Sequence, residues 1–310
     1  MIGAGVIGSL FAGHLARICD VSILTRREEH ARALNERGLR VSGRHDFTAR
    51  VRAAARPEDL PEFDLGIVAT KGTGLEPALA ALEGHAPRAT LMTVQNGLGA
   101  EEVVRRHGAW PIVTGVTFMS GTRHDDAHVE YILDTETWLG PYAGLPYERV
   151  EEVAELLVRS GLEARAFRDL MPARWSKLIF NATINAVAAL TGLPHEGRFA
   201  QEERLEDLGH LVHDLVDEGK RVAAAAGIEL HEDPWEMNVL ATRRGSAHLP
   251  SMLEDVVARR QTEIDLITGA LVREAGRLGV PVPLHTALLR LVKAKEASWQ
   301  TQASSVRAAA

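Results

Sequence analysis

The sequence predicts an α/β fold in two parts, a Rossmann-type parallel sheet with its helices followed by an all-α domain. Short apolar runs alternate with helical patterns in the first half, as βα units require. A GxGxxG turn begins at Gly3 and leads directly into a helical pattern. From about Arg168 long amphipathic patterns replace the strands. We therefore expect a dinucleotide-binding domain over residues 1–167 and a helical domain over 168–310, with the boundary near Phe167–Pro172.

Length and composition agree with this division and exclude several classes of protein. The chain has 310 residues, enough for two domains, and 45% apolar with 25% charged residues is typical of a globular protein. This composition excludes a disordered or disulfide-stapled chain. The formal charge of −7 argues against nucleic acid as a partner, because such a surface needs concentrated basic residues.

Neither a membrane nor an export route is indicated. The sequence has no apolar run near the roughly 18 residues that a membrane span needs. Its first residues lack the basic region of a signal peptide. Cys19 is the single cysteine and has no partner for an intramolecular disulfide, so we expect a cytoplasmic protein.

The first part predicts strands that are apolar and short, separated by helices with apolar residues at helical spacing. In chain order these are strand Val21–Leu24, helix Glu28–Arg37, strand Leu65–Ala69, helix Leu75–Leu82 and strand Thr90–Val94. The later runs, Ile112–Met119, Val129–Leu133 and Thr137–Leu139, are spaced as antiparallel strands. A helix over Arg149–Ser160 ends at Gly161.

The second part predicts helices alone. Amphipathic patterns cover residues 173–190, 201–226, 251–277 and 284–297. The small and polar residues of Ala297–Ala310 predict a frayed tail.

The glycine motif predicts a pyrophosphate site. It consists of Gly3, Ala4, Gly5, Val6, Ile7 and Gly8. In such a motif the first glycine permits the tight turn, the second lets the backbone approach a pyrophosphate, and the third lets the helix pack on the sheet. The helix N-terminus then offers free N–H groups and positive partial charge to the anion. A plain tight turn is the alternative, since the motif by itself is weakly specific.

The residue after the second strand distinguishes the two nicotinamide cofactors. NAD-binding chains place an acid there for the ribose 2′-hydroxyl. This chain has Thr25, Arg26 and Arg27 instead, and a guanidinium suits a 2′-phosphate. We therefore predict NADP as the cofactor, bound through Arg26. The alternative is that both arginines cap a solvated strand end.

The first strand is unusually short for a Rossmann unit. A strand of about five residues normally precedes the first glycine, and only Met1 and Ile2 do so here. We expect that the outer part of this strand is missing from the front of the sequence.

Taken together, the motifs resemble those of the ketopantoate reductase (2-dehydropantoate 2-reductase) family. The first half supplies GAGVIG, Arg26, Lys71 in VATKG and Asn96 in VQNGLG. The second half supplies W-x-K-x-x-x-N-x-x-x-N from Trp175 and two further motifs, S-M-x-x-D and T-E-I-D, over residues 251–265. The matches follow the family's order from Gly3 to about Val292, which covers nearly the whole chain.

The polar residues of the second half can also be interpreted physically. Lys177, Asn181 and Asn185 are spaced i, i+4, i+8 and lie along one face of a predicted helix. Their neighbours are apolar, so much of this helix must be buried and the stripe must find polar partners; a solvated stripe is the alternative. Ser251 and Glu263 would lie about 18 Å apart on one predicted helix. Without the family motif, Glu263 would be interpreted as a surface acid.

The resemblance implies that the helical domain over 168–310 binds the substrate and carries out catalysis. It also implies a reaction and the residues that perform it. NADPH would deliver a hydride to the ketone carbon of 2-dehydropantoate, giving (R)-pantoate for pantothenate and coenzyme A biosynthesis. Lys177 would donate the proton and Glu263 would orient that lysine. Asn181, Asn185 and Ser251 would hydrogen-bond the substrate.

The resemblance also implies a set of cofactor contacts. Lys71 and a backbone group near Gly121 would contact the cofactor, and Glu263 would lie near the nicotinamide ribose. Asn96 would lie between cofactor and substrate.

The chain departs from the family's pattern at two positions. Pro250 stands where the family tends to have a second serine, and His195 stands where some members have another substrate-side asparagine. An imidazole in place of an amide changes the hydrogen-bond donors in the pocket. Paralogues in the family act on other 2-oxo acids, so the reaction type is better defined than the substrate.

Three alternatives stay open. The chain could reduce a different 2-oxo acid, belong to the related opine or sugar-acid dehydrogenases, or bind NADP as a non-catalytic sensor. No metal site is predicted, because His210 and His213 lack a third ligand at metal-binding spacing. The helical domain offers surface for a homodimer, and no sequence feature specifies one.

Overall fold

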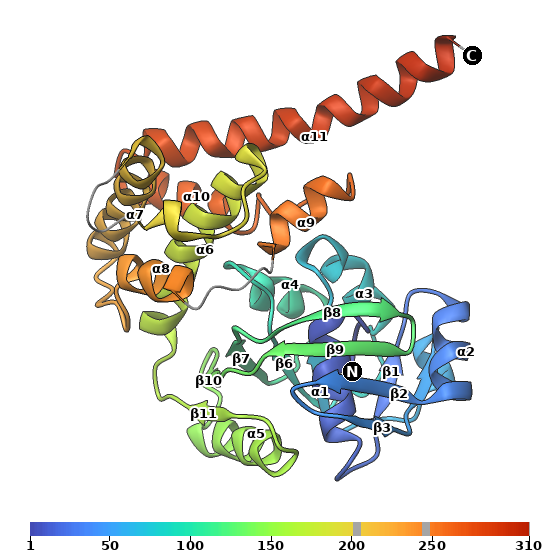
Figure 1. The fold of residues 1–310 in the computed structure, drawn as a ribbon. Coiled ribbons are helices and arrows are strands. Elements are labelled where there is room, and N and C mark those ends of the chain that lie inside the picture. The colour runs from blue at the N-terminus through green and yellow to red at the C-terminus, as the bar shows by residue number, and fades with distance from the viewer. Residues whose placement is uncertain (201–205, 244–248, 310) are drawn as a thin grey trace. The chain divides into compact units, whose positions relative to one another are not determined.

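The computed structural model describes residues 1–200, 206–243 and 249–309, with 300–309 described as backbone. The chain forms two compact units (Figure 1). The first unit contains Met1–Gln95 and Gly99–Leu170, and the second contains Asn96–Leu98 and Met171–Ala310. The short segment 96–98 therefore belongs with the helical unit, although it lies within the α/β half of the sequence.

A twisted, mostly parallel sheet forms the centre of the first unit. Ile2 forms parallel bridges with both Leu24 and Val68, so it joins β1 to β5 in place of a longer first strand. The resulting order is β4, β1, Ile2, β5, β6, β7, β10, β11. The strands are β1 (Ser22–Leu24), β4 (Arg52–Ala54), β5 (Leu65–Val68), β6 (Thr90–Thr93), β7 (Ile112–Val116), β10 (Thr137–Pro141) and β11 (Ala164–Ala166).

Neighbouring residues of these buried strands alternate between two apolar cores, as strand geometry requires. Ile67, Met92 and Val113 belong to one core, and the adjacent residues Val68, Leu91 and Ile112 belong to the other. The first core contains side chains of α1 (Val6–Leu15), α2 (Glu28–Arg37) and α5 (Tyr147–Arg159). The second contains side chains of α3 (Leu75–Ala81) and α4 (Ala100–His107). Helices therefore cover both faces of the sheet, which confirms the Rossmann-type prediction.

Among the described residues, three pairs of strands are antiparallel, and two of these pairs contain strands whose spacing predicted this arrangement. Strand β7 is parallel to β6 and pairs antiparallel with β10. A second sheet has the order β3, β2, β9, β8, in which the β2–β3 and β8–β9 pairs are antiparallel and the β2–β9 pair is parallel. Its strands are β2 (Leu39–Gly43), β3 (Phe47–Ala49), β8 (Ser120–Asp125) and β9 (His128–Leu133). Of these four, only β9 is predicted from the sequence.

The second unit is helical and is organised around α6 (Met171–Thr191). Along α6 the residues from Ala173 to Ile179 and from Ala182 to Ala189 are buried, so the helix is covered on most sides. The core is completed by α7 (Asp207–Ala225), α8 (Pro234–Arg243), α9 (Ser251–Val257), α10 (Thr268–Leu278) and α11 (Pro283–Ala309). Residues 201–205 of the predicted helix 201–226 lie outside the described residues.

The predicted helix 251–277 is wrong. The chain leaves the helical conformation after α9 and resumes it at Thr268. Arg259 has φ +49°, which ends a helix, and the N–H of Arg260 turns back to the carbonyl of Asp255 at 2.8 Å. Glu296 then accepts from both the backbone N–H (2.8 Å) and the hydroxyl (2.6 Å) of Thr262. Ser251 and Glu263 therefore do not share a helix.

The predicted frayed tail is also wrong, because α11 continues to Ala309. The small residues of this stretch have no strong helix-breaking character, and alanine is the best helix former.

A buried glutamate holds the start of α11. Glu218 on α7 accepts hydrogen bonds from the N–H groups of Leu284 and His285 and from Nδ1 of His285, each at 3.0 Å. Both side chains of the Glu218–His285 pair are buried. Burial opposes ionisation of this carboxyl, but these hydrogen bonds outweigh burial and lower its pKa.

Glu218→Ala should lower the free energy of unfolding by about 3 kcal/mol, because it leaves buried N–H groups and a buried imidazole unsatisfied. The lowered pKa also predicts a pH dependence. A carboxyl whose pKa is lower in the folded state contributes stability that is present at neutral pH and lost as the pH falls through its folded pKa. Chemical denaturation at pH 7 and at pH 4 measures both effects. A loss of stability in Glu218→Ala that is equally large at pH 4 would contradict the ionised cap.

Candidate active site

The glycine motif forms a tight turn between Ile2 and α1. Gly3 has φ +96°, a left-handed conformation that favours glycine, and it packs against Thr70 at the end of β5. A side chain at Gly8 would overlap the carbonyl oxygen of Gly3. A side chain at Gly5 would meet no atom within 4 Å, so the middle of the turn is open. This arrangement leaves room for a ligand to approach the backbone.

The N-terminus of α1 lies in this turn and lacks a side-chain cap. Gly5 is the N-cap residue, and the first helical hydrogen bond runs from Ser9 N–H to its carbonyl. The N–H groups of the first turn therefore have no acceptor within the helix, which makes this end a site for an anion. Gly121 on β8 lies beside the same end, since a Cβ there would be 3.1 Å from the side chain of Val6.

Two polar atoms are left unsatisfied near this turn. The amide nitrogen of Gln95 donates to the carbonyls of Val68 (2.8 Å) and Thr70 (3.0 Å) at the end of β5. Its amide oxygen and the hydroxyl of Thr70 are buried and have no partner among the described residues. Lys71 follows Thr70 and is exposed. An open glycine turn, an uncapped helix end and unsatisfied polar atoms fit a dinucleotide at the carboxyl edge of the sheet.

The two arginines after β1 differ in their surroundings. Arg26 is exposed and forms no side-chain hydrogen bond or ion pair with any described residue. Arg27 donates to the carboxylate of Asp126 at 2.6 Å. Asp126 lies in the turn between β8 and β9, about a hundred residues away in sequence. The sequence does not reveal the role of Asp126, because no local pattern predicts which turn reaches the end of β1.

Helix α6 carries the polar stripe of Lys177, Asn181 and Asn185, which lies largely inside the second unit. Lys177 is 9% exposed and Asn185 is 6% exposed, while Asn181 is half-buried. The amide of Asn185 has no hydrogen-bond partner among the described residues. The stripe is therefore not a solvated face, and its polar groups are placed where a bound molecule could satisfy them.

Lys177 has the most strongly perturbed environment of the stripe. Burial disfavours its ammonium form, and the nearby Glu263 carboxylate favours it. Burial is the larger effect and lowers the pKa of Lys177 to about 8. Glu263 is itself buried, in the segment between α9 and α10, where its carbonyl accepts from the N–H groups of Leu266 and Ile267. The segment that breaks the predicted helix thus brings a carboxylate toward the lysine.

Asn96 lies beside the stripe within the same unit. Its side-chain oxygen accepts a long hydrogen bond of 3.4 Å from the amide of Asn181. The segment is anchored by the N–H of Leu98, which donates to the carbonyl of Leu266. The structure therefore brings together Asn96, Asn181, Lys177 and Glu263. Ser251 begins α9, is half-buried and has no side-chain hydrogen bond with a described residue.

His195 is held by a neighbour that determines its tautomer. The amide nitrogen of Asn238 donates to the carbonyl of Phe199 at 2.8 Å, so its oxygen faces Nε2 of His195, also at 2.8 Å. Nε2 must then carry the proton. Burial lowers the pKa of His195, which leaves a neutral ring whose Nδ1 is an acceptor. His195 also contacts the rings of Phe180 and Phe199.

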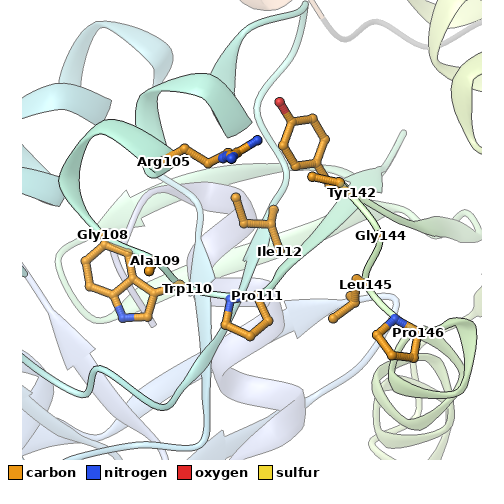
Figure 2. A pocket seen from close by; sticks show the side chains of 11 residues that line it. Arg105, Gly108, Ala109, Trp110, Pro111, Ile112, Tyr142, Gly144, Leu145 and Pro146 are labelled. Atoms are coloured by element: carbon orange, nitrogen blue, oxygen red, sulfur yellow. The ribbon is translucent and has the colours of Figure 1, made fainter.

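A surface hollow in the first unit is not part of this site. It is lined by residues that include Arg105, Trp110, Tyr142 and Pro146 (Figure 2). These residues come directly before β7 and after β10, which pair antiparallel. The hollow therefore lies at the amino edge of the parallel strands, opposite to the edge that carries the glycine turn.

Other chemistries find no support in the parts of the chain that the structure describes. No group of three or more His, Cys, Asp or Glu residues is arranged there to hold a metal ion. None of the helices in the described ranges combines the length and apolar character that a membrane span requires.

A glycine turn of the dinucleotide-binding type on one unit and a buried lysine with a carboxylate on the other are features expected of a nicotinamide-dependent oxidoreductase. Comparison with known families identifies it further. Residues 1–144 match the family described as ketopantoate reductase PanE/ApbA, and residues 169–296 match the C-terminal domain of the same family. The chain belongs to the ketopantoate reductase family.

Individual relatives agree with this assignment. The chain is 31% identical to 2-dehydropantoate 2-reductase from Pyrococcus horikoshii, over 96% of both chains. It is also 31% identical to the enzyme of that name from Streptococcus pyogenes serotype M6, over 95% of this chain and 96% of the relative.

Solved structures with this fold include two kinds of reductase. A PanE/ApbA family ketopantoate reductase from Ralstonia eutropha has a TM-score of 0.86 and 26% identity, covering 96% of this chain and 98% of its own. D-mandelate dehydrogenase with NADH and anilino(oxo)acetate has a TM-score of 0.85 and 25% identity, covering 96% and 97%.

Gly5→Ala separates ligand binding from folding. The added methyl group meets no protein atom within 4 Å, and Gly5 has φ −74°, which alanine adopts freely. We expect an unchanged melting temperature and a dissociation constant for NADPH or NADH raised about tenfold or more, because the methyl group enters the space of the pyrophosphate. Gly276→Ala on α10 is the matched control, since its methyl group also meets nothing. Equal dinucleotide affinity in both variants would show that the turn does not bind the cofactor.

Proposed function

We propose that the protein reduces 2-dehydropantoate to (R)-pantoate with NADPH, as a step of pantothenate and coenzyme A biosynthesis, and that Lys177 donates the proton. The observation that carries this proposal is the buried Lys177 ammonium with its pKa lowered to about 8 and the Glu263 carboxylate acting on it. The relatives named 2-dehydropantoate 2-reductase support the choice of substrate. The proposal assigns cofactor binding to residues 1–167 and substrate binding to residues 168–310.

A lysine with this pKa suits proton donation to a developing alkoxide. At pH 7 most Lys177 side chains are in the ammonium form. The ammonium group can polarise the ketone oxygen and stabilise the negative charge that grows there. Its proton is also held less tightly than that of an exposed lysine, so transfer to the alkoxide is easier. When bound, a nicotinamide cofactor supplies the hydride for the ketone carbon.

Glu263 acts through Lys177 in this proposal. Without a counter-charge, burial would lower the lysine pKa further, so a larger fraction of the side chain would be neutral at pH 7. Glu263 opposes that effect. It therefore favours the protonated form of Lys177, which supplies the proton of the reaction. We also propose that Glu263 lies near the nicotinamide ribose.

The remaining polar side chains of the second unit supply substrate contacts. Amides and hydroxyls can donate to a carboxylate and exchange hydrogen bonds with a hydroxyl. Asn185 and Ser251 have no side-chain partner among the described residues, and Asn181 has only the 3.4 Å bond to Asn96. We propose that Asn181, Asn185 and Ser251 bind the 2-oxo acid and that Asn96 serves both substrate and cofactor.

The cofactor assignment is NADP, bound through residues of the first unit. Arg26 is the candidate for the 2′-phosphate, because it is exposed and unpaired among the described residues, whereas Arg27 is held by Asp126. Lys71 and the backbone at Gly121 are candidates for the phosphates and the ribose. We also infer a cytoplasmic location, in keeping with a biosynthetic reductase and a single cysteine.

A second candidate function is the reduction of a different 2-oxo acid. The fold is shared with D-mandelate dehydrogenase, whose structure contains anilino(oxo)acetate. His195 favours this candidate, since it presents an acceptor nitrogen within an aromatic cluster where some family members have an amide. A panel of 2-oxo acids decides the question: kcat/KM should be largest for 2-dehydropantoate, and a larger value for an aromatic acid would favour the second candidate.

Lys177→Ala should reduce kcat by about 100-fold or more, the usual scale for the loss of a general acid, with cofactor affinity nearly unchanged. In the wild type, kcat should be constant at lower pH and fall as the pH rises through about 8, because the lysine loses its proton there. Steady-state rates from pH 6 to 10 measure both. Lys220→Ala is the control and should retain full activity, because Lys220 is a half-buried lysine paired with Asp233. Full activity in Lys177→Ala would rule out the proposed acid.

A further inference from the structure

One carboxylate at the end of β1 is surrounded by several basic side chains. The same oxygen of Asp126 accepts from Arg27 at 2.6 Å and lies 3.9 Å from both a guanidinium nitrogen of Arg123 and Nδ1 of His30. Asp126 is 26% exposed and lies in the β8–β9 turn. All of these groups belong to the first unit, which also carries Arg26.

Two guanidinium groups, those of Arg27 and Arg123, meet the single carboxylate of Asp126. Arg26 precedes Arg27 in the sequence and adds a third positive charge, and among the described residues Asp126 is the only carboxylate within 4 Å of any of the three guanidinium groups. The neighbouring Asp125 is engaged elsewhere, because it pairs with Arg37 and accepts from the N–H of Ala127.

The imidazole of the cluster is neutral at pH 7, because burial lowers the pKa of His30. Glu28 and Glu29 follow Arg27 at the start of α2, and both are exposed and negatively charged. The arginines therefore lie among carboxylates at the end of β1, where a Rossmann fold places the adenosine ribose.

We propose that Asp126 is a specificity-determining residue that limits the preference of this site for a 2′-phosphorylated dinucleotide. The proposal rests on the assignment of the NADP site at Arg26. Asp126 engages the guanidinium of Arg27 and adds a negative charge beside the arginines that would otherwise attract a phosphate dianion. The site is then able to accept dinucleotides with and without the 2′-phosphate.

The exposure of the pair favours this role over a structural one. Arg27 is 46% exposed, and ion pairs between exposed side chains contribute little to folding. The negative charge of Asp126 also repels a phosphate bound nearby, because charges in water still interact measurably over such distances at low salt. Asp126 is therefore expected to influence ligand choice more than stability.

Asp126→Asn tests the proposal, because it removes the charge and keeps the size and the hydrogen-bonding ability of the side chain. The probes are adenosine 2′,5′-bisphosphate and adenosine 5′-monophosphate, which differ by the 2′-phosphate alone. The dissociation constant for the bisphosphate should fall about threefold or more at low salt, the size expected for removing one charge at about 7 Å in water. The dissociation constant for the monophosphate should not change.

The salt dependence and the steady-state kinetics give two more readouts. The gain should shrink at about 0.5 M salt, because screening weakens the interaction. KM for NADPH should fall while kcat stays constant. An Asp126→Asn variant with an unchanged ratio of the two dissociation constants would overturn the proposal.

Two other variants complete the experiment. Asp46→Asn is the matched control: Asp46 also pairs with an arginine, Arg40, near the same small sheet, and its loss should leave both dissociation constants unchanged. A similar gain in Asp46→Asn would overturn the proposal, because it would mean that net charge alone acts. Arg26→Ala tests the underlying NADP assignment separately. If Arg26→Ala binds the bisphosphate as well as the wild type does, the NADP assignment fails. The Asp126 proposal is decided separately, by the ratio of the two dissociation constants in Asp126→Asn.

Discussion

The burial of one ammonium group is the constraint on which the candidate chemistry depends. Lys177 lies on α6, the helix around which the second unit is packed, so its charge must be kept where solvent cannot stabilise it. Glu263 makes this possible, and the chain breaks what would otherwise be one helix between α9 and α10 to bring that carboxylate into place. A backbone irregularity thereby becomes part of the proposed catalytic arrangement, and the buried helix α6 carries the lysine.

In the first unit, the corresponding constraint is the close packing of the first and third glycines of the turn, Gly3 and Gly8. Ile2 joins β1 and β5 through single bridges, and the chain turns at once into α1. Only glycine at the third motif position lets the helix begin so close to the turn, because a side chain there would overlap a carbonyl oxygen. The start of α1 has no side-chain cap, so its first N–H groups have no acceptor within the helix. Close packing and a helix end suited to an anion are thus two consequences of one backbone arrangement.

Local patterns in the sequence predicted the parallel sheet, α2 with its observed bounds and the buried stripe of α6, because each depends on the periodicity of apolar residues. They did not predict β2, β3 and β8, nor the strands β4 and β11 at the edges of the parallel sheet, because these strands are short or carry charged residues at exposed positions. The break after α9 was missed because Arg259 adopts a left-handed conformation that its residue type does not favour. Asp126 was missed because tertiary structure alone brings the β8–β9 turn to Arg27.

The central claim is that Glu263 keeps the proton on Lys177, and Glu263→Gln tests it most directly. Single-turnover rates of ketone reduction, measured from pH 5 to pH 10 with saturating cofactor, report the protonation of the lysine. In the wild type the rate should fall above about pH 8. In Glu263→Gln the lysine loses the charge that raises its pKa, so the fall should begin at lower pH. A pH profile that is lower in rate but unchanged in position would contradict the account.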